Sequence, residues 1–388
     1  MGGNLAGLFQ LDPAWAFLNH GSYGACPRVV FEAYQGWQRA LERQPVAFLE
    51  PARGHTARLR AVREAVAAEI GAQADDLVGM GNATEGLNIA AQSLALATGD
   101  EVLTTDHEYG ALEKTWAHVC RSRGARVVVA EVPLPLVSAA QFAEAIIGKI
   151  TARTRVLFLS HVTSATALVF PLTAVVAEAR ARGIITVIDG AHAPGLIPLD
   201  LDALGADFYA GNCHKWWMAP KGAAFLHVRR EMQAGVVPLV ISHGWTEAGE
   251  EPGPFGNSGF VDRLEMQGTR DPSAWLTVPE ALRFRREQGW ERVAAECAAR
   301  ALEVAERVRV LTGLQALSSP EFCAPQMVAM PVPDCDVAAL KAHLERLQVE
   351  VPCYRWRGRC FVRVSVQGYN DRGDVERLIA GLRGFFRW

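Results

Sequence analysis

Apolar and polar positions follow two different periods along the first 230 residues of the chain. Apolar residues at helical spacing predict helices at residues 28–44, 56–70, 85–97, 111–121, 139–150 and 172–182. Short runs rich in β-branched residues predict strands at residues 77–80, 101–105, 126–130, 155–160, 184–188, 208–210 and 223–228. Alternation of strands and helices is typical of a mostly parallel sheet that is covered by helices on both faces.

The rest of the chain has a different pattern. Residues 248–259 are rich in Pro, Gly and Ser and predict a loop, and two long helices are expected at residues 274–288 and 291–310. The remaining periodic segments predict a compact α+β unit, at residues 327–330, 337–347, 361–366 and 374–385. Because 388 residues exceed one ordinary core, we predict three parts: an N-terminal arm at 1–20, a large domain at 21–265 and a small C-terminal domain at 266–388.

Composition narrows the classes of partner. The 39 basic and 42 acidic residues give a formal charge of −3, and no basic stripe indicates nucleic acid binding. The longest apolar runs are far too short to cross a membrane, and the first fifteen residues do not resemble a signal peptide. Eight singly scattered cysteines favour a cytoplasmic protein with reduced thiols, and the lack of CxxC and HExxH motifs predicts no metal.

Polar residues follow several predicted strands, which is where α/β sheets bind ligands. Asp189 comes directly after the strand at 184–188, and Lys215 follows the strand at 208–210 between apolar and aromatic neighbours. An Asp that keeps a pyridine nitrogen protonated and a Lys that attacks an aldehyde are what pyridoxal 5'-phosphate (PLP) chemistry requires. The alternatives are a structural ion pair or helix cap for Asp189 and an ordinary surface position for Lys215.

A third segment, GNATEG at residues 81–86, lies between a predicted strand and a predicted helix. Backbone N–H groups at such a helix start bind phosphate, although an ordinary helix cap explains the segment equally well. The segment is neither GxGxxG nor a P-loop, which disfavours the alternative from another class, a dinucleotide-dependent oxidoreductase. A non-catalytic binding protein is disfavoured because both Asp189 and Lys215 are present.

Eight short motifs in the same order carry a family resemblance: LNHGSYG at 18–24, NATEG at 82–86, DHEYGA at 106–111, HVTS at 161–164, DGAHAPG at 189–195, HKW at 214–216, QGTRDP at 267–272, and RVS at 363–365 with YN at 369–370. From about residue 17 to its end, the chain resembles the class V aminotransferase group of fold-type I PLP-dependent enzymes, and most of all its isopenicillin N epimerase-like subgroup. The resemblance implies an α/β large domain with a mostly parallel sheet and a smaller α+β C-terminal domain.

The resemblance also implies roles around PLP. Lys215 would hold the cofactor as a Schiff base, Asp189 would pair with its ring nitrogen, and His192 would lie near its phenolic oxygen. Ser164 stands where many relatives have Asn for that same oxygen. Phosphate contacts are implied for Ala83, Thr84, Asn212 and His214, and, from the other subunit of a homodimer, for Gly268 and Thr269.

The remaining implied roles concern the substrate, an amino-acid-type small molecule. Arg363 matches the guanidinium that binds the substrate carboxylate, unless it is a plain surface residue. Tyr109 or His107 would stack on the cofactor ring, and we favour Tyr109. The remaining candidates either line the mouth of the site or only order the N-terminal arm: Asn19, His20 and Tyr23.

The exact reaction stays open at this stage. We expect an epimerase or racemase acting at the α-carbon, with a C–S β-lyase or a class V aminotransferase as alternatives that use the same residues. Cysteine desulfuration needs a nucleophilic thiol on a mobile loop. Cys353 is the one tempting candidate, and its surroundings predict the end of a strand instead.

Overall fold

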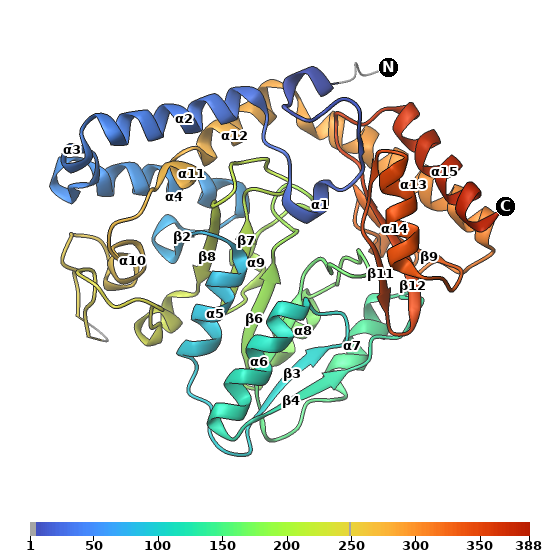
Figure 1. Ribbon diagram of the computed structural model, residues 1–388. Helices are drawn as coiled ribbons and strands as arrows, with labels where there is room; N and C mark the ends of the chain where they lie inside the picture. The colour runs from blue at the N-terminus through green and yellow to red at the C-terminus, as the bar shows by residue number, and fades with distance from the viewer. Residues whose placement is uncertain (1–4, 248–249) are drawn as a thin grey trace.

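The computed structural model describes residues 5–247 and 250–388, and a seven-stranded sheet lies at the centre of this part of the chain (Figure 1). The strand order is β2-β8-β7-β6-β5-β3-β4. All neighbours pair in parallel except β8, which runs antiparallel to both β2 and β7. The strands are β2 (Leu77–Met80), β3 (Glu101–Thr105), β4 (Arg126–Ala130), β5 (Thr154–Ser160), β6 (Ile185–Gly190), β7 (Phe208–Asn212) and β8 (Ala224–Val228). The mostly parallel sheet predicted from the sequence is therefore confirmed.

Helices cover both faces of this sheet because its central strands are apolar on both sides. One face packs against α5, α6 and α10 in a core that includes Val102, Phe158 and Leu226. On the other face, α4 packs on β2 and α8 on β6, with α12 and α7 behind them. These helices are α4 (His55–Ile70), α5 (Ala83–Ser93), α6 (Gly110–Arg123), α7 (Ala139–Ile147), α8 (Thr173–Ala181), α10 (Gly259–Glu265) and α12 (Val278–Glu287).

The long helix that the sequence predicts at residues 274–288 is in fact two helices, α11 (Ser273–Leu276) and α12. Pro279 lies in the first turn of α12 and has no N–H to donate to the preceding turn. Thr277 ends α11, and its hydroxyl donates to the carbonyl of Ser273. A proline that fits the start of a helix thus interrupts an otherwise continuous apolar pattern.

The C-terminal part forms a smaller unit, drawn in orange and red in Figure 1. Its antiparallel sheet has the order β11-β12-β9, and α13 packs against β9. Its elements are α13 (Trp290–Thr312), β9 (Met327–Val332), α14 (Val337–Arg346), β10 (Val349–Glu350), β11 (Cys353–Trp356), β12 (Arg359–Ser365) and α15 (Arg372–Phe386). A small C-terminal domain is confirmed, whereas the boundaries at 20/21 and 265/266 stay predictions.

The N-terminal segment crosses to this C-terminal unit. Strand β1 (Ala16–Phe17) pairs in parallel with β10, and the one-turn helix α1 (His20–Tyr23) follows it. The other helices are α2 (Arg28–Arg43), α3 (Pro45–Leu49) and α9 (Leu201–Leu204), with 3-10 turns at Ala6–Leu8, Pro51–Arg53, Ala74–Asp76, Arg230–Gly235 and Pro320–Phe322. The pairing of β1 with β10 therefore places α1 beside the C-terminal unit.

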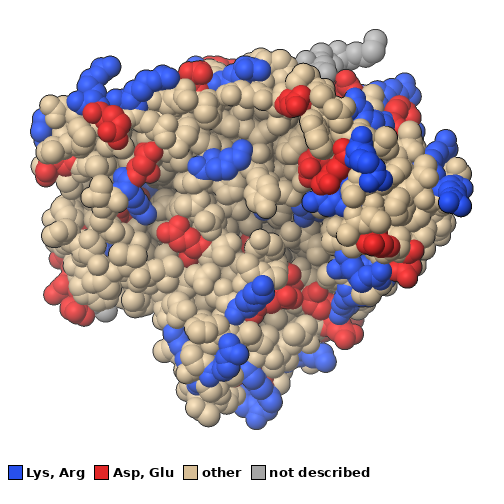
Figure 2. Space-filling view, in the orientation of Figure 1, with Lys and Arg blue, Asp and Glu red and all other residues tan. Residues whose placement is uncertain are grey.

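Two observations concern the surface. Among residues 5–247 and 250–388, no helix is both long and apolar enough to pass through a membrane. Figure 2 shows basic and acidic side chains interspersed over the face that it draws. This face therefore carries no broad region of a single charge.

Candidate active site

Segments that follow β2, β5, β6 and β7 meet at one edge of the large sheet, around a cavity of about 530 Å³. The carboxyl ends of parallel strands form such a crevice in open α/β sheets. Eleven of the side chains expected in the site line this cavity: Tyr23, Ala83, Thr84, Tyr109, Ser164, Asp189, His192, Asn212, His214, Lys215 and Arg363. The fold therefore gathers residues that lie up to 340 positions apart in the sequence.

Lys215 lies just after β7, and the two residues that follow it, Trp216 and Trp217, are buried in the core. Its Nζ lies 3.1 Å from Nε2 of His192. Burial, and next the positive charge of Arg363, lower the pKa of Lys215 to about 7. The amine is therefore partly neutral near neutral pH, as a nucleophile or proton acceptor must be.

Asp189 is at the end of β6, where only 4% of its surface is exposed. Its Oδ1 accepts a hydrogen bond from the N–H of Ala191 at 2.9 Å. Burial raises the pKa of this carboxyl, and the nearby Lys215 opposes that rise. A protonated ring nitrogen in the cavity would supply the positive partner that a buried carboxylate needs.

The N-terminus of α5 forms another wall of the cavity. Asn82 caps this helix by accepting the N–H of Glu85, and the N–H of Ala83 donates to Oδ1 of Asn212 at 2.8 Å. Because Asn212 accepts the N–H of Ala83, this N–H is already used within the protein, whereas Thr84 lines the cavity beside it. His214 is tied to the backbone by a 3.2 Å contact between its Nδ1 and the carbonyl of Ala223.

Arg363 enters the cavity from β12 of the small domain and is 6% exposed. Its Nη1 donates to the carbonyl and hydroxyl oxygens of Ser164, at 2.6 and 3.1 Å, and its Nη2 donates to the hydroxyl of Ser22 at 3.1 Å. These neutral partners leave its positive charge uncompensated. Such a guanidinium suits a substrate carboxylate.

The structure distinguishes between Tyr109 and His107, and it shows which of the N-terminal candidates line the cavity. Tyr109 is 47% exposed and lines the cavity, whereas His107 is fully buried, with Nδ1 2.7 Å from the hydroxyl of Thr166. Tyr23 also lines the cavity and is 73% exposed. Asn19 and His20 are buried behind it and order the N-terminal arm, since Asn19 bonds to Glu350 and His20 to Tyr369.

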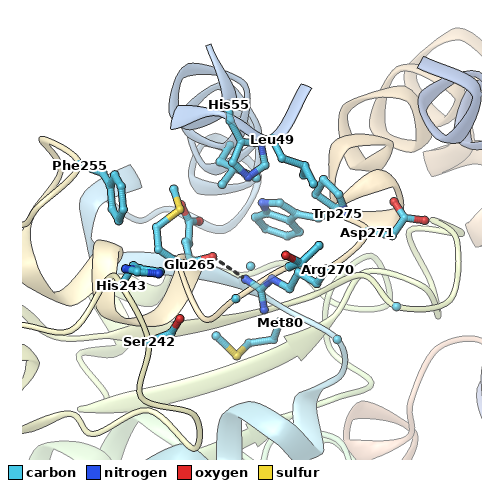
Figure 3. Close-up of a pocket in the computed structure, with 18 of the residues that line it drawn as sticks. Leu49, His55, Met80, Ser242, His243, Phe255, Glu265, Arg270, Asp271 and Trp275 are labelled. Atoms are coloured by element: carbon cyan, nitrogen blue, oxygen red, sulfur yellow. Dashed lines mark hydrogen bonds between the residues drawn. The ribbon is translucent and has the colours of Figure 1, made fainter. Parts of the chain in front are cut away.

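Gly268 and Thr269 do not line the Lys215 cavity. They are exposed and border a second cavity of about 510 Å³, shown in Figure 3. Beside them, the guanidinium of Arg270 donates to the backbone carbonyl of Glu265 at 3.3 Å. Both residues are therefore free to contact another molecule from the surface of this protomer.

Sequence reasoning missed several residues of the cavity. Ser22 holds Arg363, and Ser160 faces the cavity next to Asp189 on the neighbouring strand. Lys221 also lines the cavity, and its Nζ donates to the carbonyl of Gly24 at 2.9 Å. The motif LNHGSYG contains Ser22 and was the one available signal for it.

Cys353 is the first residue of β11, where the sequence predicted the end of a strand, and it does not line the cavity. Burial raises the pKa of its thiol to about 12. A thiol with so high a pKa is a poor nucleophile at neutral pH. The structure therefore gives no support to cysteine desulfuration by Cys353.

The side chains of the cavity fit PLP. A carboxylate, a partly neutral amine and a helix N-terminus stand around one space, and they match the ring nitrogen, the aldehyde and the phosphate. The uncompensated guanidinium of Arg363 remains for the substrate.

Comparison with known proteins also indicates a PLP-dependent enzyme. The family model "Aminotransferase class-V" matches residues 25–378. Isopenicillin N epimerase of Amycolatopsis lactamdurans is 37% identical over 96% of each chain. A probable chloroplastic L-cysteine desulfhydrase of Arabidopsis thaliana is 32% identical over 97% of this chain and 84% of the relative.

A solved structure has the same fold. It is a variant of the protein C-DES, with glycine covalently linked to its PLP cofactor. It superposes with a TM-score of 0.81 at 23% identity, over 98% of each chain. The predicted fold, family and cofactor are thus confirmed, and the chain belongs to the class V aminotransferase family of PLP-dependent enzymes.

Proposed function

We propose that this enzyme moves a proton at the α-carbon of an α-amino-acid substrate, as an epimerase does. The observation that carries the proposal is that the amine of Lys215 and the guanidinium of Arg363 line one cavity. When bound, PLP draws electrons from the substrate's Cα–H bond into its ring and so makes that proton acidic. The relatives named isopenicillin N epimerase support this reaction class.

Each side chain has a role in this proposal. Arg363 binds the substrate carboxylate and orients the α-carbon toward Lys215. Lys215 takes the proton, and its pKa of about 7 lets the amine accept a proton and give it back. Asp189 compensates positive charge at the ring nitrogen, while His192 restrains Lys215 through their 3.1 Å contact.

A second candidate is β-elimination of a sulfur-bearing group. Tyr109 lines the cavity and is well exposed, so that its hydroxyl is available to protonate a departing group. Several relatives are named L-cysteine desulfhydrase, which supports this alternative. Epimerisation needs a second acid on the opposite face of the α-carbon, and a Tyr that stacks on the ring is poorly placed for that role.

The active unit in this proposal is a homodimer. Gly268 and Thr269 contact the phosphate in the partner's site, which agrees with their exposure and with their absence from the lining of the Lys215 cavity in their own protomer. C2 dimers are the commonest closed assemblies. Each site then contains residues of both chains.

The test is a reaction in deuterium oxide with L-amino acids, including cysteine and its derivatives. Epimerisation places deuterium at the α-carbon of recovered amino acid and forms the D-isomer, which mass spectrometry and chiral chromatography detect. Elimination instead yields a keto acid, ammonia and a thiol or related sulfur compound. Stoichiometric keto acid without a sulfur product contradicts both candidates and indicates an aminotransferase.

A further inference from the structure

Glu108 is a buried carboxyl group with no part in the roles described above. It follows β3, and only 6% of its surface is exposed. Its Oε1 lies 2.6 Å from the hydroxyl of Thr105, and its Oε2 lies 2.6 Å from the hydroxyl of Ser160. Both partners are neutral. A buried carboxylate without a cation is unfavourable, so Glu108 favours its protonated form.

A second buried carboxyl group, at the start of β3, provides a contrast. Glu101, at the start of β3, forms ion pairs with Arg126 and Arg153. Hydrogen bonds from Thr151 and Arg126 lower its pKa to about 2, whereas burial raises the pKa of Glu108 to about 8. An ionised carboxylate therefore lies at the start of β3, and a neutral carboxylic acid lies three residues after its end.

The neutral acid lies close to the ring-nitrogen end of the cavity. Ser160 pairs with Asp189 across β5 and β6, and both line the cavity. The negative charge of Asp189 acts on Glu108 and helps to keep it protonated. Two neighbouring carboxyl groups in a region of low dielectric constant do not ionise together readily.

We propose that Glu108 is a positioning residue. Its carboxyl group stays protonated next to Ser160, so that Asp189 carries the negative charge at this end of the cavity. The hydroxyl of Thr105 accepts the N–H of His107 at 3.2 Å and donates to Oε1 of Glu108. Protonation of Glu108 at Oε2 would reverse the hydrogen bond that the hydroxyl of Ser160 donates to this oxygen at 2.6 Å. The hydroxyl hydrogen of Ser160 would then be free to point into the cavity. The inference rests on the proposed role of Asp189.

The groups that face Glu108 and Asp189 come from several elements. Strands β3 and β5 present the hydroxyls of Thr105 and Ser160 to Glu108, and β6 presents the carboxyl of Asp189. Lys215, after β7, acts on Asp189 from the other side of the cavity. His107 is neutral above pH 6, since burial lowers its pKa to about 4. In the holoenzyme, where the amine of Lys215 would be bound to the cofactor, we assign the titration of this cluster near pH 8 to Glu108.

Infrared spectroscopy of the holoenzyme tests the stored proton directly. The wild-type protein should show the C=O band of a protonated carboxylic acid near neutral pH, and this band should disappear with a midpoint near pH 8. Glu108→Gln should lack the titrating band. Glu101→Gln, the matched control at the start of β3, should keep it. A wild-type protein without the band, or a Glu108→Gln protein that retains it, would overturn the proposal.

The cofactor absorbance gives an independent readout that a purely structural role would not change. In the wild type, ionisation of Glu108 adds a negative charge near the ring, so the absorption band should shift around pH 8. In Glu108→Gln that shift should be lost, while turnover at pH 7 stays within roughly threefold because an amide replaces the neutral acid isosterically. An unchanged shift in the variant contradicts the inference. Neither the infrared band nor the absorbance shift depends on which reaction is catalysed. Failure of this inference can therefore be distinguished from failure of the proposed function.

Discussion

Lys215 and Asp189 show how burial shifts the pKa values of two ionisable side chains in one cavity. Loss of water lowers the pKa of the amine to about 7 and raises that of the carboxyl. Strand-end reasoning found both residues, because an acid and a lysine after consecutive strands form a local pattern. It did not find Ser22, whose contact with Arg363 joins residues 341 positions apart. Such contacts depend on how the small domain packs and leave no periodic signal.

Replacement of Asp189 by Ala should lower kcat by about 100- to 1000-fold, since a positioned electrostatic partner typically contributes this much. PLP should remain bound through its other contacts. Steady-state kinetics at measured cofactor occupancy tests this. Asp207→Asn is the matched control, because Asp207 is also buried but pairs with Arg229 at the start of β7. Near-native turnover of the Asp189→Ala holoenzyme would exclude the ring-nitrogen role.

The rate at which the apoprotein recombines with PLP should depend on pH through Lys215. Only the neutral amine attacks an aldehyde, and a pKa lowered to about 7 means that the amine is mostly protonated at pH 6 and mostly neutral at pH 8. The rate should therefore rise through pH 7 and level off above pH 8, as stopped-flow absorbance can follow. A rate that continues to rise toward pH 10 would show an unperturbed lysine.

At the scale of elements, one-sided burial repeats along a helix, and this periodicity predicted most helices. The strands of the large sheet are buried on both faces, and short β-rich runs predicted each of them. Its errors lie at element ends. Helix α5 begins two residues earlier than predicted because Asn82 caps it, and the pattern at 274–288 is interrupted at Pro279. Caps and prolines act on single backbone hydrogen bonds. Hydrophobic periodicity is averaged over many residues and does not detect them.

The start of α5 should contribute to phosphate binding through Thr84. Thr84→Val keeps the shape of the side chain but removes its hydroxyl, and loss of a hydrogen bond to a charged group corresponds to about 10- to 100-fold weaker PLP binding. Ser93→Ala, at the other end of the same helix, is the control, since Ser93 bonds to the backbone and lies away from the cavity. Equal PLP affinity in the two variants would argue against phosphate at this helix start.

At the scale of the whole molecule, two domains and the N-terminal segment meet at the cavity, which the three-part division of the sequence anticipated only in outline. The large domain supplies Lys215 and Asp189, β12 supplies Arg363, and α1 supplies Ser22. A second protomer is the remaining component of the proposed site. The sequence indicates it only through the family motif that contains Gly268 and Thr269.

Shared sites predict complementation between two inactive variants. Lys215→Ala removes the amine, and Thr269→Asp places a negative charge against the partner's phosphate. A mixed dimer has one site with intact Lys215 and an intact Thr269 from the other chain, so mixing the proteins should restore part of the activity. Sedimentation should show dimers throughout. Active monomers, or no recovery on mixing, would refute the shared site.

The most direct test of the account is to locate PLP on the chain. Borohydride reduction of the yellow holoenzyme, followed by peptide mass spectrometry, should place the cofactor on Lys215. Lys221→Ala, the control for the neighbouring lysine of the cavity, should be labelled at Lys215 like the wild type. Label on Lys221 of the wild-type protein, or a protein that binds PLP without covalent attachment to Lys215, would contradict the account.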